Sequence, residues 1–215
     1  MRILITGGGG FIGSRLAQTL QARHPAVRIT LLDMVIPPAL ESRFECIAGD
    51  LASPEVIGKA LHPETESVFH LAAVVSGGAE ADFDLGYRVN LDGTRALLDA
   101  CRKLVKPPKV VFASSVAAFG GALPEVLDDS TTPAPQTSYG TQKVISEYLI
   151  ADFTRKGMVD GRSLRLPTIV VRPGKPNLAA SSFASGVIRE PLSGAISICP
   201  VPESTGVWLL SPRRV

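Results

Sequence analysis

The start of the chain constrains its fold more than any other segment, because an apolar run there ends abruptly in glycines. Residues 1–6 read MRILIT, and Gly7, Gly10 and Gly13 follow within a segment that continues as a helical apolar pattern. This order predicts a strand, a tight turn and a helix. Gly7 would permit the turn, Gly10 would let the backbone approach a pyrophosphate, and Gly13 would let the helix pack on the strand. The first N–H groups of the helix would then face the diphosphate of a dinucleotide.

A second predicted strand covers residues 27–33 (VRITLLD) and ends in a carboxylate. Asp33 lies 20 residues after Gly13, close to the spacing at which an acidic side chain meets the adenosine ribose of a dinucleotide. A carboxylate there accepts hydrogen bonds from the ribose hydroxyls and repels a 2′-phosphate. We therefore expect NAD rather than NADP as the cofactor; the alternative is that Asp33 only closes the strand.

A third predicted strand, over residues 43–48, leads into another acidic side chain, Asp50. The carboxyl ends of parallel strands are where ligands gather in open sheets. Asp50 either holds the adenine amino group or caps the helix that begins near Pro54, for which Ser53 is the better placed cap.

The fourth predicted strand, over residues 68–71, runs into a loop of small residues at 72–78. Small residues let the backbone pass close beneath a cofactor. Ser76 in this loop either touches substrate or is an ordinary loop residue. The next predicted helix, over 84–104, contains Asn90, whose amide either bridges to this loop or is exposed.

Residues suited to proton transfer follow the fifth predicted strand, which covers residues 109–113 and ends in Ser114 and Ser115. Tyr139 and Lys143 are four residues apart and therefore share one face of a helix. A phenol with a pKa of about 10 is a poor base at neutral pH. A neighbouring ammonium and the positive charge of oxidised nicotinamide would favour the phenolate, which could then take a proton from a substrate hydroxyl. A serine hydroxyl from the strand end would orient the same oxygen.

Composition indicates a globular chain with a sizeable core. Of the 215 residues, 45% are hydrophobic, and 22 basic against 20 acidic residues give a net charge of +2. We see no basic stripe that would indicate nucleic acid, and no apolar run long enough for a membrane span or a signal peptide. We therefore expect a cytoplasmic protein with neither nucleic acid nor membrane as a partner.

The cysteines and histidines indicate no metal site. The histidines lack the spacing of metal ligands, and the cysteines are odd in number and far apart, which also argues against a disulfide framework. We expect buried thiols at Cys46, Cys101 and Cys199.

Together these motifs resemble the extended short-chain dehydrogenase/reductases, which form the NAD-dependent epimerase/dehydratase family. The resemblance covers about the first 175 residues and rests on TGGGGFIG at 6–13, GDL at 49–51, HLAA at 70–73, SSVAAFG at 114–120 and YGTQK at 139–143. It implies an α/β fold, a Rossmann-type doubly wound parallel sheet. It also implies that the helices beginning near residues 84 and 137 form the interface of a homodimer.

The resemblance assigns roles to individual residues. Tyr139 is implied as the general base, Lys143 as its electrostatic partner and nicotinamide-ribose ligand, and Ser115 as the substrate-orienting hydroxyl, a role that Ser114 could share. The backbone of 71–73 is implied to lie under the cofactor. The expected cofactor contacts are Gly7, Gly10, Phe11, Ile12, Gly13, Asp33, Asp50, Leu51, Leu71, Ala72, Ala73, Asn90, Ser114, Tyr139, Lys143 and Pro167.

Departures from the family pattern narrow the reaction. Dehydrating members carry acids directly after the catalytic hydroxyl, whereas Val116 and Ala117 follow here. Members that act on nucleotide sugars usually have an asparagine where this chain has Thr168. The stretches LRLPTIVVRPGKPN at 164–177 and SSFASGVIREPL at 181–192 are similar to family members that oxidise sugar acids, D-erythronate among them.

A small acid substrate needs a cation for its carboxylate, and Arg172, Lys175 or Arg189 could supply one. We take Arg172 as the first choice; the alternative is a solvated arginine at a strand end. The expected substrate contacts are Ser76, Ser115, Tyr139, Thr168 and Arg172.

The last part of the chain predicts short elements: a helix over 181–191 and strands over 195–199 and 207–210. Family members usually continue further and complete a small substrate-covering domain. We therefore expect an NAD-binding domain over 1–175 and, over 176–215, the start of a truncated, incomplete substrate-binding domain.

Three functions stay open on the sequence. The first is NAD-dependent oxidation of a secondary hydroxyl of a small sugar acid, most plausibly D-erythronate at C2 to 2-oxo-tetronate. The second is nucleotide-sugar epimerisation by the same Tyr139 and Lys143 with tightly held NAD. The third is an NAD-binding module without catalysis.

Overall fold

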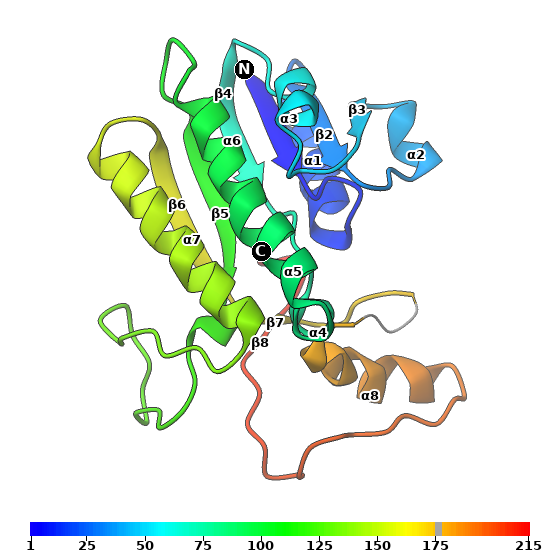
Figure 1. The fold of residues 1–215 in the computed structure, drawn as a ribbon. Coiled ribbons are helices and arrows are strands. Elements are labelled where there is room, and N and C mark those ends of the chain that lie inside the picture. Colours follow the sequence, from blue (N-terminus) through cyan, green and yellow to red (C-terminus); the bar gives the residue numbers. More distant parts are fainter. Residues whose placement is uncertain (175–177) are drawn as a thin grey trace.

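Six parallel strands form the central sheet, in the order β3-β2-β1-β4-β5-β6 (Figure 1). The computed structural model describes residues 1–174 and 178–215. The order confirms the expected Rossmann-type doubly wound sheet. The strands are β1 (Arg2–Thr6), β2 (Arg28–Asp33), β3 (Glu45–Ala48), β4 (Thr65–His70), β5 (Lys109–Ser115) and β6 (Asp160–Leu166).

The apolar runs form strands because both faces of the central sheet are covered. In β1, Ile3 and Ile5 belong to one buried cluster, and Leu4 between them belongs to the other. This alternation follows from the two-residue period of a strand, and it makes a doubly covered strand apolar throughout.

Helices cover the two faces unequally. The cluster that contains Ile3 and Ile5 also includes Ala17 of α1. The cluster that contains Leu4 includes Ile57, Leu97 and Ile150 from the helices of the opposite face. Figure 1 shows α3, α6 and α7 side by side across the sheet. The helices on the two faces are α1 (Phe11–Arg23) on one side and α3 (Pro54–Ala60), α6 (Gly93–Cys101) and α7 (Ser138–Arg155) on the other.

The chain changes direction across the sheet between β1 and β4. From β1 the chain builds outward through β2 to β3, and it then crosses back to β4 and continues through β5 to β6. The loops after β1 and β4 therefore diverge at the carboxyl edge, which is where open α/β sheets leave a crevice for a ligand.

The helix predicted over 84–104 is wrong as a single element. The chain instead forms several pieces from residue 76 onward, and Asn90 lies within a stretch of π-helix. The side chain of Asn90 forms hydrogen bonds outside the helix, to the loop after β4 and to α7. The pieces before α6 are α4 (Ser76–Ala81), α5 (Phe83–Gly86) and η1 (Tyr87–Asp92), and a short α2 (Pro38–Glu41) precedes β3.

Among the described residues, the C-terminal part forms the helix α8 and a small two-stranded sheet. The helix predicted over 181–191 is confirmed as α8 (Phe183–Leu192), preceded by the 3₁₀ turn η3 (Ala180–Ser182). The strand predicted over 207–210 is present as β8 (Leu209–Leu210), which pairs in parallel with β7 (Thr168–Ile169). The strand predicted over 195–199 is wrong: Ile196 and Ile198 are 95% and 81% exposed and belong to no strand.

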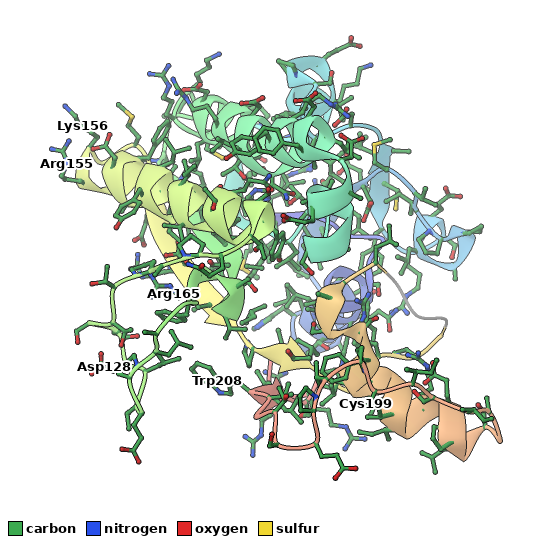
Figure 2. All side chains as sticks on the ribbon, turned by 60° about the horizontal axis from the view of Figure 1, so that its bottom comes forward. Asp128, Arg155, Lys156, Arg165, Cys199 and Trp208 are labelled. Atoms are coloured by element: carbon green, nitrogen blue, oxygen red, sulfur yellow. The ribbon has the colours of Figure 1, made fainter. Side chains whose placement is uncertain are left out.

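Figure 2 shows Cys199 and Trp208 on this C-terminal segment, apart from α7 and its labelled end. Cys101 is buried as expected, whereas Cys46 is partly buried and Cys199 is exposed, so the expectation of buried thiols is wrong for Cys199. The expected domain boundary between residues 175 and 176 lies outside the described residues. Within 1–174 and 178–215, no helix combines the length and apolar character that crossing a membrane requires.

Candidate active site

A cavity of about 910 Å³ lies at the carboxyl edge of the sheet, at the point where the chain changes direction. Its lining comes from the loops after β1, β2, β4 and β5, from the start of α7 and from the segment around α8. Of the expected contacts, those that line it are Gly7, Gly10, Phe11, Ile12, Gly13, Asp33, Asp50, Leu51, Leu71, Ala72, Ala73, Ser76, Ser114, Ser115, Tyr139, Lys143, Pro167, Thr168 and Arg172. Asn90 is not among the lining residues.

The glycine corner is shaped by two close backbone approaches. Gly7 has a φ of +70°, and a Cβ there would lie 2.7 Å from the backbone nitrogen of Ala72. A Cβ on Gly13 would lie 2.2 Å from the carbonyl oxygen of Gly7. A side chain at Gly13 would push α1 away from the turn, and one at Gly7 would clash with the backbone after β4, so both positions require glycine.

Gly10 leaves open the space that a diphosphate needs. A Cβ on Gly10 would have one near neighbour, the Gly7 carbonyl oxygen at 3.2 Å, and would otherwise enter the cavity that Gly10 lines. Gly10 is also the N-cap of α1 and makes no side-chain cap bond. The first N–H groups of α1 therefore remain available to an anion, so the corner fits the diphosphate of NAD.

Asp33 is held at the rim of the cavity by backbone donors. Its Oδ2 accepts a hydrogen bond of 3.0 Å from the Gly9 N–H, and its Oδ1 accepts one of 2.7 Å from the Met34 N–H. The carboxylate is thus fixed beside the glycine corner, where the ribose role was predicted. That role stays a prediction.

Asp50 is paired with a cation rather than used as a helix cap. Its Oδ1 accepts from the Ala52 N–H at 2.9 Å, and Oδ2 forms an ion pair with Arg88. The hydrogen bond from Arg88 is the main cause that lowers the pKa of the Asp50 carboxyl. The cap of α3 is Ser53, whose Oγ accepts from the Val56 N–H. The cap alternative for Asp50 is therefore wrong, and its adenine role stays a prediction.

The segment 71–75 after β4, which forms the floor of the cavity, is held in place by a buried imidazole. His70 Nδ1 lies 2.7 Å from Thr6 Oγ1, and His70 Nε2 lies 2.8 Å from Thr94 Oγ1. Thr6 Oγ1 in turn accepts from the Ala72 N–H at 3.3 Å. Burial lowers the pKa of His70 to about 3, so the imidazole is neutral and fixes the strand end under the cavity.

Asn90 bridges to the same loop, which confirms one of the two alternatives for its amide. Its Oδ1 accepts from the Val74 N–H at 2.8 Å, and its Nδ2 donates to the Val74 carbonyl oxygen at 3.0 Å. Asn90 is 3% exposed. It therefore supports a lining residue of the cavity without lining the cavity itself.

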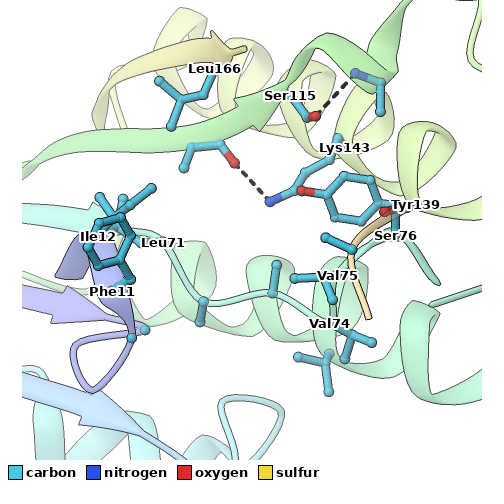
Figure 3. A pocket seen from close by; sticks show the side chains of 18 of the residues that line it. Phe11, Ile12, Leu71, Val74, Val75, Ser76, Ser115, Tyr139, Lys143 and Leu166 are labelled. Atoms are coloured by element: carbon cyan, nitrogen blue, oxygen red, sulfur yellow. Dashed lines mark hydrogen bonds between the residues drawn. The ribbon is translucent and has the colours of Figure 1, made fainter. Parts of the chain in front are cut away.

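Tyr139 and Lys143 project from the first turns of α7 toward the cavity (Figure 3). Thr137 caps this helix, because its Oγ1 accepts from the Gly140 N–H at 3.1 Å. Lys143 Nζ lies 5.5 Å from the centre of the Tyr139 ring and donates a hydrogen bond of 2.8 Å to the Ala113 carbonyl oxygen. The cation is thus held between β5 and the phenol.

Burial dominates the protonation of both groups in the chain alone. It raises the pKa of the Tyr139 phenol, against the lowering effect of a hydrogen bond with Ser115. It lowers the pKa of the Lys143 ammonium to about 7, against the raising effect of Glu147. The expected easily ionised phenol is therefore not a property of the polypeptide alone, because burial penalises each charge.

The two serines at the end of β5 point to different partners. Ser115 Oγ accepts from the Ala117 N–H at 3.1 Å and lies on the Tyr139 side. Ser114 is buried, and its hydroxyl donates to Glu147, which also forms an ion pair of 2.8 Å with Arg165. The hydroxyl of Ser114 is therefore engaged away from Ser115, which disfavours a shared orienting role.

Thr168, on β7, and Arg172, in the segment that follows β7, also line the cavity. The Arg172 N–H donates to Ser185 Oγ at 3.0 Å, and burial, followed by the nearby charge of Arg189, lowers the pKa of the Arg172 guanidinium. Arg189 donates to the Arg172 carbonyl oxygen at 2.6 Å and pairs with Glu190. The other candidate cation, Lys175, lies outside the described residues.

The segment after β4 contacts the chain around residues 178–180. Ser76 Oγ accepts from the Ala180 N–H at 2.9 Å, and the Gly77 N–H donates to the Leu178 carbonyl oxygen at 2.9 Å. Several lining residues carried no motif that would have identified them from the sequence. They are Leu85, Arg88, Val89 and Thr137.

Fold and site together define an enzyme class with a nicotinamide cofactor: the chain belongs to the NAD dependent epimerase/dehydratase family, whose sequence profile matches residues 3–206. The prediction of an NAD-dependent enzyme of the extended short-chain type is confirmed at this level. Two curated relatives are each named D-erythronate dehydrogenase. The one from Cupriavidus necator is 58% identical over 223 residues, covering 99% of this chain and 69% of the relative. The one from Haemophilus influenzae is 49% identical over 219 residues, covering 100% and 70%.

A solved structure is also similar. The nucleoside-diphosphate-sugar epimerase from Agrobacterium tumefaciens is 45% identical and superposes with a TM-score of 0.88, covering 99% of this chain and 66% of that one. The chain thus spans about two thirds of the length of these relatives.

Proposed function

We propose that this chain carries the cofactor site and catalytic residues of a dehydrogenase that oxidises D-erythronate at C2 to 2-oxo-tetronate, with NAD as the oxidant. The observation that supports this most is the Tyr139–Lys143 pair, in which Lys143 is buried and Tyr139 is partly buried, with Ser115 beside the phenol and Arg172 lining the same cavity. The names of the two curated relatives support the choice of substrate.

In this proposal Tyr139 Oη takes the proton of the substrate hydroxyl, and Ser115 Oγ orients the oxygen that loses it. The hydride leaves the carbon that bears this hydroxyl. NAD, when bound, would accept the hydride, and its positively charged nicotinamide ring would favour the phenolate. Lys143 offsets the charge on Tyr139. Its Nζ donates one hydrogen bond to the Ala113 carbonyl oxygen, and its other N–H groups can bind the nicotinamide ribose.

The proposed cofactor contacts follow the lining of the cavity. The corner at 7–13 holds the diphosphate, Asp33 accepts from the adenosine ribose, and Asp50 meets the adenine amino group. The backbone of 71–73 lies under the cofactor and Pro167 beside the nicotinamide. The carboxylate of Asp33 makes NAD preferred over NADP.

The substrate carboxylate is assigned to Arg172. Arg172 lines the cavity, and among residues 1–174 and 178–215 no carboxylate lies within salt-bridge distance of its guanidinium. Arg189, by contrast, is already paired with Glu190. Thr168 and Ser76 lie on the same cavity and supply further polar contacts.

The test compares net oxidation with isomerisation. Wild-type protein is incubated with NAD and a panel of aldonic and uronic acids, and NADH formation is followed by absorbance. Accumulation of NADH with D-erythronate supports the proposal. No NADH with any acid, together with interconversion of UDP-sugars, overturns it in favour of the second candidate, an epimerase, which the similarity to the Agrobacterium tumefaciens protein favours. NAD binding without either reaction would identify a binding module instead.

We further propose that residues 1–175 and 176–215 act as cofactor and substrate domains and that the enzyme is a cytoplasmic homodimer. The proposed dimer contact is formed by the helices from residue 84 onward and by α7. Light scattering on purified protein tests the dimer, and a monomer mass across the concentration range would contradict it.

A further inference from the structure

Gln142 stands out because it is fully buried beside the catalytic pair without lining the cavity. It is 0% exposed, and it directly precedes Lys143 on α7. Adjacent residues of an α-helix are rotated by about 100° about its axis, so the side chain of Gln142 points away from that of Lys143, toward Asn90 of η1. The same face carries Ser146, whose hydroxyl donates to the Gln142 carbonyl oxygen at 2.8 Å and to the Asn90 carbonyl oxygen at 3.3 Å.

One hydrogen bond connects this glutamine to the floor of the cavity. Gln142 Oε1 accepts from Asn90 Nδ2 at 2.7 Å. The amide orientation of Asn90 is set independently, because the N–H and carbonyl oxygen of Val74 each bind the matching atom of its side chain. The acceptor facing Asn90 must therefore be Oε1, which leaves Nε2 on the other side.

That second atom of the Gln142 amide makes the residue unfavourable for stability alone. Within the described part of the chain, Nε2 is buried and has no hydrogen-bond partner. It lies against Gly86, where an added Cβ would come within 2.8 Å of it. An apolar side chain of similar shape would fill this space without an unpaired donor.

We propose that Gln142 is a positioning residue: through Asn90 it holds the catalytic helix α7 at a fixed place against the Val74 floor of the cofactor cavity. The cavity is lined from two separate elements, because Val74 follows β4 and Lys143 lies on α7. The cofactor site therefore requires a fixed distance between these two elements. The buried bridge Val74–Asn90–Gln142 joins them over consecutive hydrogen bonds. The inference rests on the proposed NAD site and not on the identity of the oxidised acid.

The test uses Gln142→Met and Gln142→Glu in the full chain, with Gln18→Met on the exposed face of α1 as the matched control. Methionine keeps the volume but removes the acceptor for Asn90. Glutamate keeps that acceptor, because burial holds its carboxyl protonated. NADH affinity is measured by fluorescence, the melting temperature by calorimetry, and kcat and KM on whichever substrate the wild type oxidises.

For Q142M we expect a melting temperature within about 3 °C of the wild type, an NADH Kd about fivefold weaker and a kcat roughly tenfold lower. Q142E should keep the NADH Kd within about twofold, and the Gln18 variant should match the wild type. Q142M with unchanged Kd and kcat overturns the inference, and so does a large loss of melting temperature with unchanged affinity. A wild type that binds NADH but oxidises no acid would contradict the proposed function and leave this inference standing, because the comparison of NADH Kd values still tests the role of Gln142.

Discussion

Lys143 places its ammonium nitrogen 5.5 Å from the centre of the Tyr139 ring while donating a hydrogen bond to the Ala113 carbonyl oxygen at 2.8 Å. The cation is thereby tied to the end of β5 and held against the phenol. Burial opposes a separate charge on either group, raising the pKa of Tyr139 and lowering that of Lys143 to about 7. A phenolate forms there only with a positive partner nearby, which links catalysis to cofactor binding.

This relationship predicts the pH dependence of oxidation. The active form, a phenolate beside a charged Lys143, carries as many protons as a neutral phenol beside a neutral Lys143. We therefore expect kcat/KM to rise with pH toward the lower pKa of the pair, that of Lys143 at about 7, and then to level off. Lys143→Met removes the cation, so the rise should move to higher pH and the rate near neutrality should fall roughly a hundredfold. Rates measured between about pH 6 and pH 10 check this. An unshifted profile in the methionine variant would remove Lys143 from the role.

Asp33 should decide the choice between NAD and NADP. Asp33→Asn removes the negative charge that repels a 2′-phosphate but keeps a polar side chain of the same size. We expect the ratio of kcat/KM for NAD over NADP to fall roughly tenfold or more. Asp84→Asn, at an exposed position, is the control and should leave the ratio unchanged. A wild type that already prefers NADP would defeat the assignment.

Arg172 should affect the acid and spare the cofactor. Arg172→Ala removes the cation assigned to the substrate carboxylate, and KM for the acid should rise roughly tenfold to a hundredfold, with little change in KM for NAD. Arg155→Ala at the exposed end of α7 is the matched control. Equal KM values for the acid in both variants would show that another group binds the carboxylate.

His70 predicts acid sensitivity of the fold. Its pKa is lowered by burial to about 3 from 6.5, so the unfolded chain binds its proton first as the pH falls. Its contribution is therefore complete above about pH 6.5 and is lost toward pH 3, by on the order of 5 kcal/mol. Urea unfolding at about pH 7.5 and pH 4.5 measures this.

His70→Gln should lower the free energy of unfolding at neutral pH but should flatten its decline toward acid, because the titrating group is gone. His62→Gln, on the surface, serves as the control for the general effect of replacing a histidine. The carboxylates of the chain are the same in all variants, so their effect on the pH dependence cancels in the comparison. An equally steep decline in the His70 and His62 variants would show that His70 does not cause it.

Strands β1 to β5 were predictable from the sequence because each contains an apolar run that leads into a glycine or a small or polar residue, whereas β6, with the sequence DGRSLRL, is not an apolar run. The 20-residue spacing from Gly13 to Asp33 and the four-residue spacing from Tyr139 to Lys143 then placed candidate site residues on predicted elements. Both features are local, so one sequence is enough to recognise them.

The failures come from contacts between distant parts of the chain. Periodicity predicted one helix over 84–104, but the buried amide of Asn90 binds a loop 16 residues earlier and α7 52 residues later, and the helix is interrupted there. Ser114 looked equivalent to Ser115, yet its partner Glu147 lies 33 residues away. Residues 195–199 alternate as a strand would, but no neighbouring strand pairs with them in the described chain.

The central claim is that the Tyr139 hydroxyl is the base that acts on the substrate hydroxyl, and a pair of tyrosine variants tests it most directly. NADH formation with D-erythronate is measured for Tyr139→Phe and for Tyr148→Phe, which alters an exposed phenol on the same helix. We predict that Tyr139→Phe loses at least about a thousandfold in kcat while binding NADH with wild-type affinity, and that Tyr148→Phe turns over like the wild type. Oxidation by Tyr139→Phe at a rate close to that of Tyr148→Phe would contradict the account.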